Sequence, residues 1–125
     1  MKKSRLISPS QQKGQRYEKL AMRYLKKQGL RLLEQNFYSA SGEIDLILMD
    51  ADILVFVEVR FRENSRYGNA LESVTYSKQK KILNTAKLYL LKRGLYGTVP
   101  CRFDVVGLHK INNAVEFQWI KNAFQ

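Results

Sequence analysis

Apolar residues recur along this chain with two periods, one typical of helices and one typical of strands. Helical spacing runs over residues 12–28, where Gly29 follows, and returns over residues 77–93, with Ser77 as the expected cap and Gly94 after the end. The apolar faces comprise Tyr17, Leu20, Ala21, Tyr24 and Leu25 in the first segment and Ile82, Leu83, Ala86, Tyr89 and Leu90 in the second. Two amphipathic helices are therefore expected, each packing one face on a core.

Five further segments have the composition and alternation of strands. The first covers residues 30–37, the next two flank a turn at Ala51-Asp52, and the last two cover residues 101–108 and 114–120, joined through Asn112-Asn113. This order (αβββαββ) predicts an α/β sandwich in which an N-terminal helix and a crossover helix flank a mixed central β-sheet. One domain over residues 1–125 is expected, with residues 1–11 as a flexible basic tail.

The hairpin around Ala51-Asp52 concentrates charge on two apolar strands. A two-residue turn pairs residues whose numbers sum to 103, so that Asp45 faces Glu58 and Glu43 faces Arg60. Strict alternation also predicts that Ile44, Leu46 and Leu48 share the opposite face. Two opposed carboxylates repel each other, and a bound Mg²⁺ or Mn²⁺ would offset that repulsion. The alternative is an ordinary solvated strand face with cross-strand ion pairs.

Three motifs in this region carry a family resemblance. They are Gly42-Glu43-Ile44-Asp45-Leu46-Ile47, Phe56-Val57-Glu58-Val59-Arg60-Phe61-Arg62 and Arg102-Phe103-Asp104-Val105-Val106. With them the chain resembles, over nearly its whole length, the YraN family of small bacterial proteins of unassigned function. That family is similar to the restriction-endonuclease-like nucleases, whose site is an Asp followed by Glu-x-Lys on the next strand, often with a Glu from the first helix.

The resemblance implies a set of site residues in this chain. Asp45 and Glu58 match the metal-binding carboxylates, Arg60 stands where the Lys usually is, and Glu18 matches the helix acid. The Gly14-x-x-x-Glu18 pattern also resembles the opening helix of archaeal Holliday-junction resolvases. From the residues alone, Glu18 either leans toward the hairpin or is solvated.

The implied activity is that of an Mg²⁺- or Mn²⁺-dependent endonuclease acting on structured DNA. Arg60 is a departure from the family pattern, because an Arg stays protonated and cannot act as a general base. We expect it to stabilise charge developing on the phosphate while metal held by Asp45, Glu58 and Glu18 activates water. A nucleic-acid-binding module with the same fold and no turnover is the main alternative, and a basic RNA-associated protein is a more distant one.

Three further polar residues are candidates for a supporting role near the site. Glu43 shares a strand face with Asp45, Gln79 lies in the first turn of the expected second helix, and Asp104 lies in the third motif. Each also has an ordinary structural explanation. Gln79 could be a solvated helix residue, and Asp104 could form an ion pair with Arg102 on the same strand face.

The charge balance predicts a polyanionic partner. The chain carries 22 Lys and Arg against 11 Asp and Glu, a net charge of +11. Residues 1–17 and 73–103 contain no acid, and the carboxylates are concentrated in the hairpin. Nucleic acid, DNA in the first instance, is the expected partner, and a homodimer remains open. The candidate nucleic-acid-binding residues are Lys13, Arg16, Arg62, Arg66, Lys78, Lys80 and Lys81, with Tyr67 as a stacking candidate. The alternative is that these cations serve solubility.

Cysteine and histidine are too few for several other kinds of site. One Cys, Cys101, excludes an internal disulfide, and with His109 as the one His a Cys/His zinc cluster is also excluded. Cys101 is expected to fill the core and His109 to lie at the surface. Lys2, Lys3 and Arg5 are not followed by an apolar segment of signal-peptide length. A cytoplasmic protein without membrane spans is expected.

Overall fold

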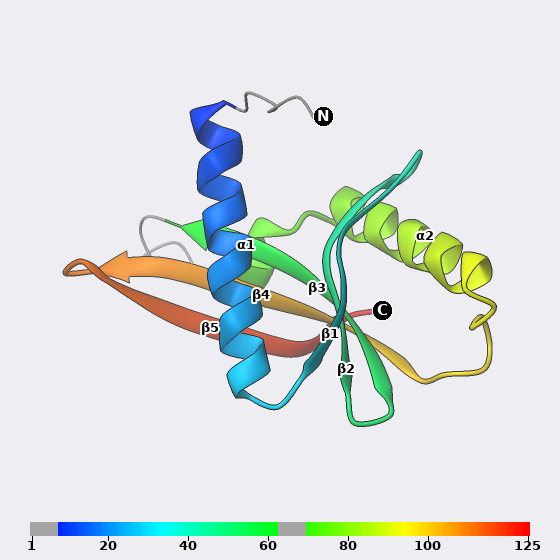
Figure 1. Ribbon diagram of the computed structural model, residues 1–125. Helices are drawn as coiled ribbons and strands as arrows, with labels where there is room; N and C mark the ends of the chain where they lie inside the picture. Colours follow the sequence, from blue (N-terminus) through cyan, green and yellow to red (C-terminus); the bar gives the residue numbers. More distant parts are fainter. Residues whose placement is uncertain (1–7, 63–69) are drawn as a thin grey trace, which may run out of the picture.

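A computed structural model describes residues 8–62 and 70–125 of the protein (Figure 1). Its elements follow the predicted order with one added 3-10 turn: α1 (Pro9–Lys27), β1 (Arg31–Ser39), β2 (Gly42–Asp50), β3 (Ile53–Arg62), η1 (Ala70–Ser73), α2 (Tyr76–Lys92), β4 (Cys101–Ile111) and β5 (Ala114–Phe124). The strands form one sheet in the order β1-β2-β3-β4-β5, with β3 and β4 parallel and the other neighbours antiparallel. The predicted mixed α/β fold is confirmed at this level.

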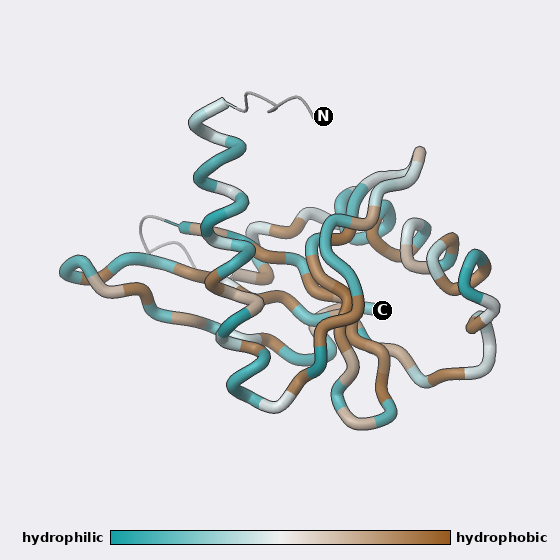
Figure 2. Tube along the Cα trace, viewed as in Figure 1, coloured by the Kyte–Doolittle hydropathy of each residue, from teal (hydrophilic) through white to brown (hydrophobic). Residues whose placement is uncertain are grey.

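The two helices cover opposite faces of the sheet. α1 packs Tyr17, Ala21 and Leu25 on one face, together with the strand residues Leu46, Leu48, Val55, Val57, Val106 and Leu108. α2 and η1 cover the other face, where the buried residues include Ile82, Ala86, Tyr89, Phe37, Ile44, Ile47, Leu54, Phe56 and Val105. Figure 2 shows the apolar residues gathered along the central strands. Residues 44–48 and 54–58 are buried because helices lie on both sides of them.

The predicted hairpin register is confirmed where the β2–β3 ladder exists. Its pairs run from Asp50–Ile53 at the turn to Leu46–Val57, and the numbers of each pair sum to 103. The predicted turn at Asn112-Asn113 is also present, and both residues have positive φ, 49° and 66°. Asn tolerates this conformation better than most residues, which suits a tight hairpin turn.

Both helix starts differ from the prediction. α1 begins at Pro9, three residues before the expected start, because Ser8 and Gln11 form a capping box in which each side chain accepts a hydrogen bond from the other's backbone N–H. α2 is capped by Thr75 and not by Ser77; the Thr75 hydroxyl accepts from the Lys78 N–H at 3.1 Å. Neither helix of the described ranges has the apolar length that a bilayer crossing needs.

The alternation of side chains along β2 breaks at Asp45. Leu46 belongs to the cluster under α1, whereas Ile44, two residues earlier, belongs to the cluster under α2. The prediction that Ile44 and Leu46 share a face is therefore wrong. The reversal coincides with a left-handed backbone at Asn36 in β1 (φ 51°), between the ladder pairs Gln35–Leu46 and Phe37–Ile44, and a left-handed residue interrupts the regular alternation of a strand.

Cys101 does not fill the core as predicted. It is exposed at the first position of β4, and the buried part of that strand begins three residues later at Asp104. The pattern around Cys101 resembled a buried strand because Phe103, Val105 and Val106 follow it. His109 is partly buried beside Glu116, with 3.4 Å between Nε2 and Oε2.

Asp104 anchors β5 to β4. Its fully buried carboxylate accepts hydrogen bonds from the Arg102 guanidinium (3.0 Å), the Trp119 indole N–H (2.9 Å) and the Asn122 backbone N–H (2.9 Å). Arg102 also pairs with Asp50 at the tip of the β2–β3 hairpin, at 2.9 Å. The predicted ion pair with Arg102 is thus confirmed, and the carboxylate oxygens of Asp104 are engaged in holding the sheet together.

Removing the Asp104 carboxylate should destabilise the fold strongly. Asp104→Ala removes the acceptor of three buried or partly buried donors, the Arg102 Nε–H, the Trp119 N–H and the Asn122 N–H, and leaves Arg102 with Asp50 alone, so we expect the free energy of unfolding to fall by about 3–5 kcal/mol in urea titrations. Glu116→Ala is the matched control, since Glu116 is exposed in the same strand pair and its ion pair should contribute about 1 kcal/mol or less. Similar losses for the two variants would contradict this role of Asp104.

Candidate functional site

The candidate site forms where β2 and β3 separate. The antiparallel ladder ends at Leu46–Val57, and the next pair on the same register would be Asp45 and Glu58. In place of a backbone partner, the Val59 N–H donates to the Asp45 carboxylate at 2.8 Å. We call this opening, with Asp45 and Glu58 at its base, the fork.

The fork lets side chains from both helical layers meet. Glu58 lies beside α2, where Lys78 contacts it, whereas Glu18 comes from α1 on the opposite face. The charges of Glu18 and Glu58 both act on Asp45, and Asp45 and Glu58 are 8% and 4% exposed. The structure therefore brings together the three carboxylates that the sequence analysis assigned to metal binding. A continuous β2–β3 ladder would have separated α1 from the residues of the α2 face.

Asn36 positions the carboxylates of Glu18 and Glu43 through hydrogen bonds. Its left-handed backbone places the amide between α1 and β2, where it donates to Glu18 at 2.8 Å and to Glu43 at 3.2 Å. Glu43 also interacts with the hydroxyl of Tyr38 and raises the pKa of that phenol. The predicted pairing of Glu43 with Arg60 is wrong, because the ladder ends before reaching them and Arg60 has other partners.

Burial and mutual repulsion hold two of these carboxyl groups toward their protonated form. The pKa of Asp45 is well above its ordinary value, chiefly because the group is buried and then because of the Glu58 charge; the Val59 N–H opposes the shift. The pKa of Glu18 is also raised, first by burial and further by the charges of Glu43 and Glu58, against the hydrogen bond from Asn36. A cation placed among these groups would relieve both effects.

Two cations face the Glu58 carboxylate. The Lys78 ammonium lies 3.3 Å from its Oε2 and the Arg60 guanidinium lies 3.5 Å from the same oxygen. Arg60 is held in place by Ser73, whose hydroxyl and carbonyl accept from the guanidinium at 3.1 and 3.0 Å. The position of Lys78 at the fork was not anticipated, since the sequence analysis assigned it to the general basic surface.

The 3-10 turn η1 positions Ser73 beside Arg60. Its Ala70 packs on Gly107 of β4 so closely that a Cβ on Gly107 would lie 2.5 Å from the Ala70 Cβ. The Ala70 N–H donates to the Gln118 side chain of β5 at 2.8 Å. The glycine is therefore required for η1 to sit on the sheet at the height of Arg60, its ladder partner in β3.

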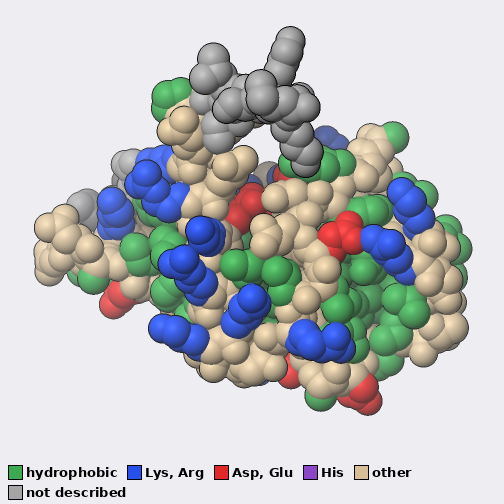
Figure 3. Space-filling view, in the orientation of Figure 1, with side chains coloured by type: hydrophobic (Ala, Val, Ile, Leu, Met, Phe, Trp, Pro, Cys, Tyr) green, Lys and Arg blue, Asp and Glu red, His purple; other side chains and the backbone are tan. Residues whose placement is uncertain are grey.

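Beside the fork lies a solvent-open cleft of about 360 Å³, which we call the acidic cleft. It is lined by Gln11, Gly14, Gln15, Glu18, Asn36, Tyr38 and Glu43. Figure 3 shows acidic side chains in a hollow beside α1, with Lys and Arg side chains on the surface around them. The cleft opens Glu18 and Glu43 to solvent on one side of α1.

Other predicted residues lie away from the fork or outside the described ranges. Gln79 donates its amide to the Val74 carbonyl at 3.1 Å, so it supports the start of α2. Lys80 and Lys81 are exposed on α2, with the Lys80 ammonium 5.0 Å from the Tyr76 ring centre. Arg66 and Tyr67 fall within residues 63–69 and most of the expected tail within residues 1–7, which are not described.

The sequence analysis missed Asn36, Ser73 and Lys78 as parts of the site. Asn36 did carry a signal, because Asn is disfavoured inside strands and enriched at positive φ. Ser73 and Lys78 carried none that separates them from ordinary loop and surface residues, since both reach the fork through tertiary packing.

Comparison with known proteins places the chain in a family. The model of the uncharacterised protein family UPF0102 matches residues 17–108, which include the fork, α2 and most of β4. A UPF0102 protein of Psychromonas ingrahamii is 49% identical over 125 residues, covering 100% of this chain and 99% of the relative. One of Stutzerimonas stutzeri is 46% identical over 119 residues, covering 95% and 99%. The chain belongs to the UPF0102 family, and the expected membership in a family of small bacterial proteins of unassigned function is confirmed.

The raised pKa of Asp45 predicts how stability depends on pH. The folded state retains a proton that the unfolded state releases, so this group's contribution is fully present below its unfolded pKa of about 4 and is lost as the pH rises toward the raised value. Asp45→Asn keeps the acceptor for Val59 and removes the titration. We expect Tm to increase at pH 7, by about 3–5 °C for each kcal/mol of repulsion relieved, with little change near pH 4.

Asp52→Asn serves as the control for this measurement. It removes one carboxylate from the exposed hairpin turn and changes the net charge by the same amount. If both variants shift Tm equally across the pH range, the effect belongs to net charge and not to the fork.

Proposed function

We propose that this UPF0102 protein is a metal-dependent nuclease that hydrolyses phosphodiester bonds of structured DNA at the fork. The observation that carries the proposal is the convergence of buried Asp45 and Glu58 with Glu18 from the opposite layer. The arrangement of α1, the mixed sheet and α2 supports a restriction-endonuclease-like sandwich, in which these carboxylates come from the expected elements. Burying like charges together destabilises a fold, so their placement favours a functional reason.

The donor set fits a hard divalent cation. Carboxylate oxygens are the ligands that Mg²⁺ and Mn²⁺ prefer, and burial leaves the Asp45 and Glu18 carboxyls in need of a counter-charge. Asp45, Glu58 and Glu18 are the residues that would hold the ion. When bound, the ion would supply a water of lowered pKa and neutralise charge on the phosphate.

Arg60 and Lys78 supply fixed positive charge at the same place. Arg60 is permanently charged and is oriented by two hydrogen bonds from its guanidinium to Ser73. The Lys78 side chain is 45% exposed, so its ammonium lies between the buried Glu58 and the solvent from which a substrate arrives. Both cations can stabilise negative charge that develops on a phosphate at the fork.

Gly14 keeps the acidic cleft open to a polymer backbone. A glycine inside a helix costs about 0.5–1 kcal/mol relative to Ala, and a Cβ at Gly14 would meet no atom within 4 Å. No packing contact among the described residues therefore requires this glycine. A bare helix surface one turn before Glu18 favours close approach of a ligand to the carboxylates.

A second candidate is a nucleic-acid-binding module with this fold and no turnover. The observation that favours it is the balance around Glu58, whose charge already has two cationic partners. Although Glu18, Asp45 and Glu58 lie near one another, no three His, Cys, Asp or Glu side chains in the described part of the chain are already arranged closely enough to hold a metal ion. In that case Arg60 and Lys78 would contact phosphate directly and the carboxylates would orient them.

A cleavage assay separates the two candidates. We expect wild-type protein to cleave at least one of duplex, single-strand, flap and four-way-junction DNA in Mg²⁺ or Mn²⁺, and Asp45→Asn and Glu58→Gln to lose at least 100-fold in rate while still binding. The metal should also raise the wild-type Tm and leave that of Asp45→Asn unchanged, because an ion that binds the folded state stabilises it. If Mg²⁺ and Mn²⁺ leave the wild-type Tm unchanged and no substrate is cleaved, the result would favour the second candidate, the binding module.

The two cations at Glu58 can be tested separately. Lys78→Met should slow cleavage by about 10²–10³-fold while affinity falls much less, since a group that acts in the transition state affects rate more than binding. Arg60→Ala should behave similarly, and Arg60→Lys should retain part of the rate. Lys92→Met, at the exposed end of α2, is the control and should cleave within a few-fold of wild type. Wild-type rates for both Lys78→Met and Arg60→Ala would exclude this mechanism.

A further inference from the structure

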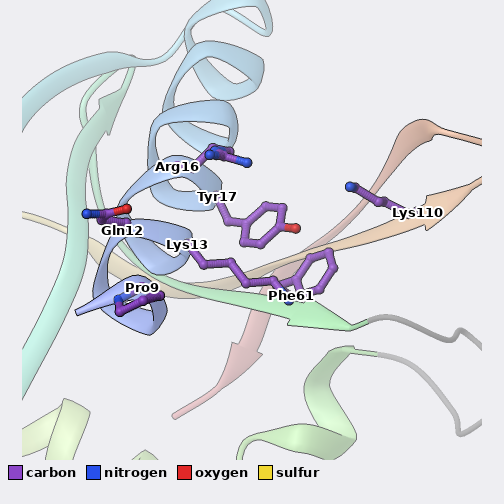
Figure 4. A pocket seen from close by; sticks show the side chains of 7 residues that line it. All are labelled: Pro9, Gln12, Lys13, Arg16, Tyr17, Phe61 and Lys110. Atoms are coloured by element: carbon purple, nitrogen blue, oxygen red, sulfur yellow. The ribbon is translucent and has the colours of Figure 1, made fainter.

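A second cleft, of about 490 Å³, lies on the other side of α1 (Figure 4). Three cations border it, Lys13 and Arg16 from α1 and Lys110 from β4, and Tyr17 and Phe61 form its wall. None of the described residues that line it carries a carboxylate. We call it the basic cleft. It is separate from the acidic cleft, which opens on Gly14 and Glu18.

The wall of the basic cleft is firmly built. The rings of Tyr17 and Phe61 are stacked, with centroids 3.8 Å apart and planes 7° apart, and Tyr17 is buried. The Lys13 ammonium lies 4.9 Å from the centre of the Phe61 ring, which keeps this charge at the cleft. Cations gathered around one concavity create a positive potential that an anion relieves.

The basic cleft lies a short distance from the fork along two elements. Tyr17 and Glu18 are consecutive in α1, and Phe61 follows Glu58 by three residues in β3, about 10 Å at the rise of a strand. Phosphates of one DNA strand follow each other about every 3.4 Å along the duplex axis. A strand whose reactive bond lies at the fork therefore has a phosphate within reach of the basic cleft.

We propose that the basic cleft binds a backbone phosphate of the nucleic acid, one to three nucleotides from the bond held at the fork. Arg16 and Lys110 contact the phosphate from two sides, and Lys13 adds charge from the aromatic wall. The position relative to a reactive bond rests on the proposed nuclease function, whereas phosphate binding itself does not. The cleft would set which bond of the strand reaches the carboxylates.

Binding without metal tests the cleft independently of catalysis. The probe is a fluorescein-labelled 20-base-pair duplex, titrated with the full chain in EDTA between 50 and 200 mM salt and followed by anisotropy. For the double variant Arg16→Gln/Lys110→Gln we expect a loss of affinity on the order of tenfold or more, and a slope of log K against log salt that is flatter by about 1.8, or 0.9 for each contact. The charge-retaining Arg16→Lys/Lys110→Arg should bind nearly as wild type.

The matched control is Lys26→Gln/Lys27→Gln, which removes two exposed charges from the far end of the same helix. Equal losses for the two double variants would overturn the proposal, because the charge would then act only through the overall field. Unchanged binding by Arg16→Gln/Lys110→Gln would overturn it as well. If Arg16→Gln/Lys110→Gln loses affinity while wild-type protein cleaves nothing in Mg²⁺ or Mn²⁺, phosphate binding by the basic cleft is supported and the nuclease assignment fails.

Discussion

The hydrogen bond from the Val59 amide to the Asp45 carboxylate is the interaction on which the candidate site depends. It satisfies a buried backbone donor that has lost its strand partner, so β2 and β3 can part without leaving that group unpaired. The separation then exposes Asp45 and Glu58 to α1, and Glu18 completes the group. In the proposed nuclease, this one carboxylate would have both a structural and a chemical role.

Charge is arranged around α1 with opposite sign on its two sides. The side of α1 that carries Gly14 and Glu18 faces the acidic cleft, which Glu43 of β2 also lines. The side that carries Lys13 and Arg16 faces the basic cleft, which Lys110 of β4 also lines. For a polyanion the two sides are complementary: the cations attract it, while the carboxylates repel it unless a metal ion is present. In the proposed nuclease, such a division would let general affinity and reactivity be governed by different residues, and it would make reactivity dependent on the ion.

Much of the fold could be predicted from periodicity, and the site could be predicted in part. The β2–β3 register followed from the two-residue turn, and the resemblance assigned Asp45, Glu58 and Glu18, which the structure brings together. The face reversal at Asp45 could not be predicted, because it depends on the backbone of Asn36 in another strand. The roles of Ser73 and Lys78 could not be predicted for a similar reason, because both depend on tertiary packing. For Ser73, the contact between Gly107 and Ala70 sets where η1 lies on the sheet. The cap of α2 was ambiguous because Thr75 and Ser77 are both good capping residues.

The parallel pairing of β3 with β4 has a consequence for the order in which the molecule assembles. Every other strand pair joins neighbours through a short turn, whereas β3 and β4 are separated in the chain by residues 63–100, which include η1 and α2. Contacts between segments distant in the chain are slow to form because of the entropy of closing the intervening loop. We therefore expect the β1–β2–β3 meander, which contains Asp45 and Glu58, to form early as a local unit, and Gly107 and Lys110 to join it when the β4–β5 hairpin docks. In this order of assembly, the carboxylate pair and the surface that would guide a ligand to it form in different folding events.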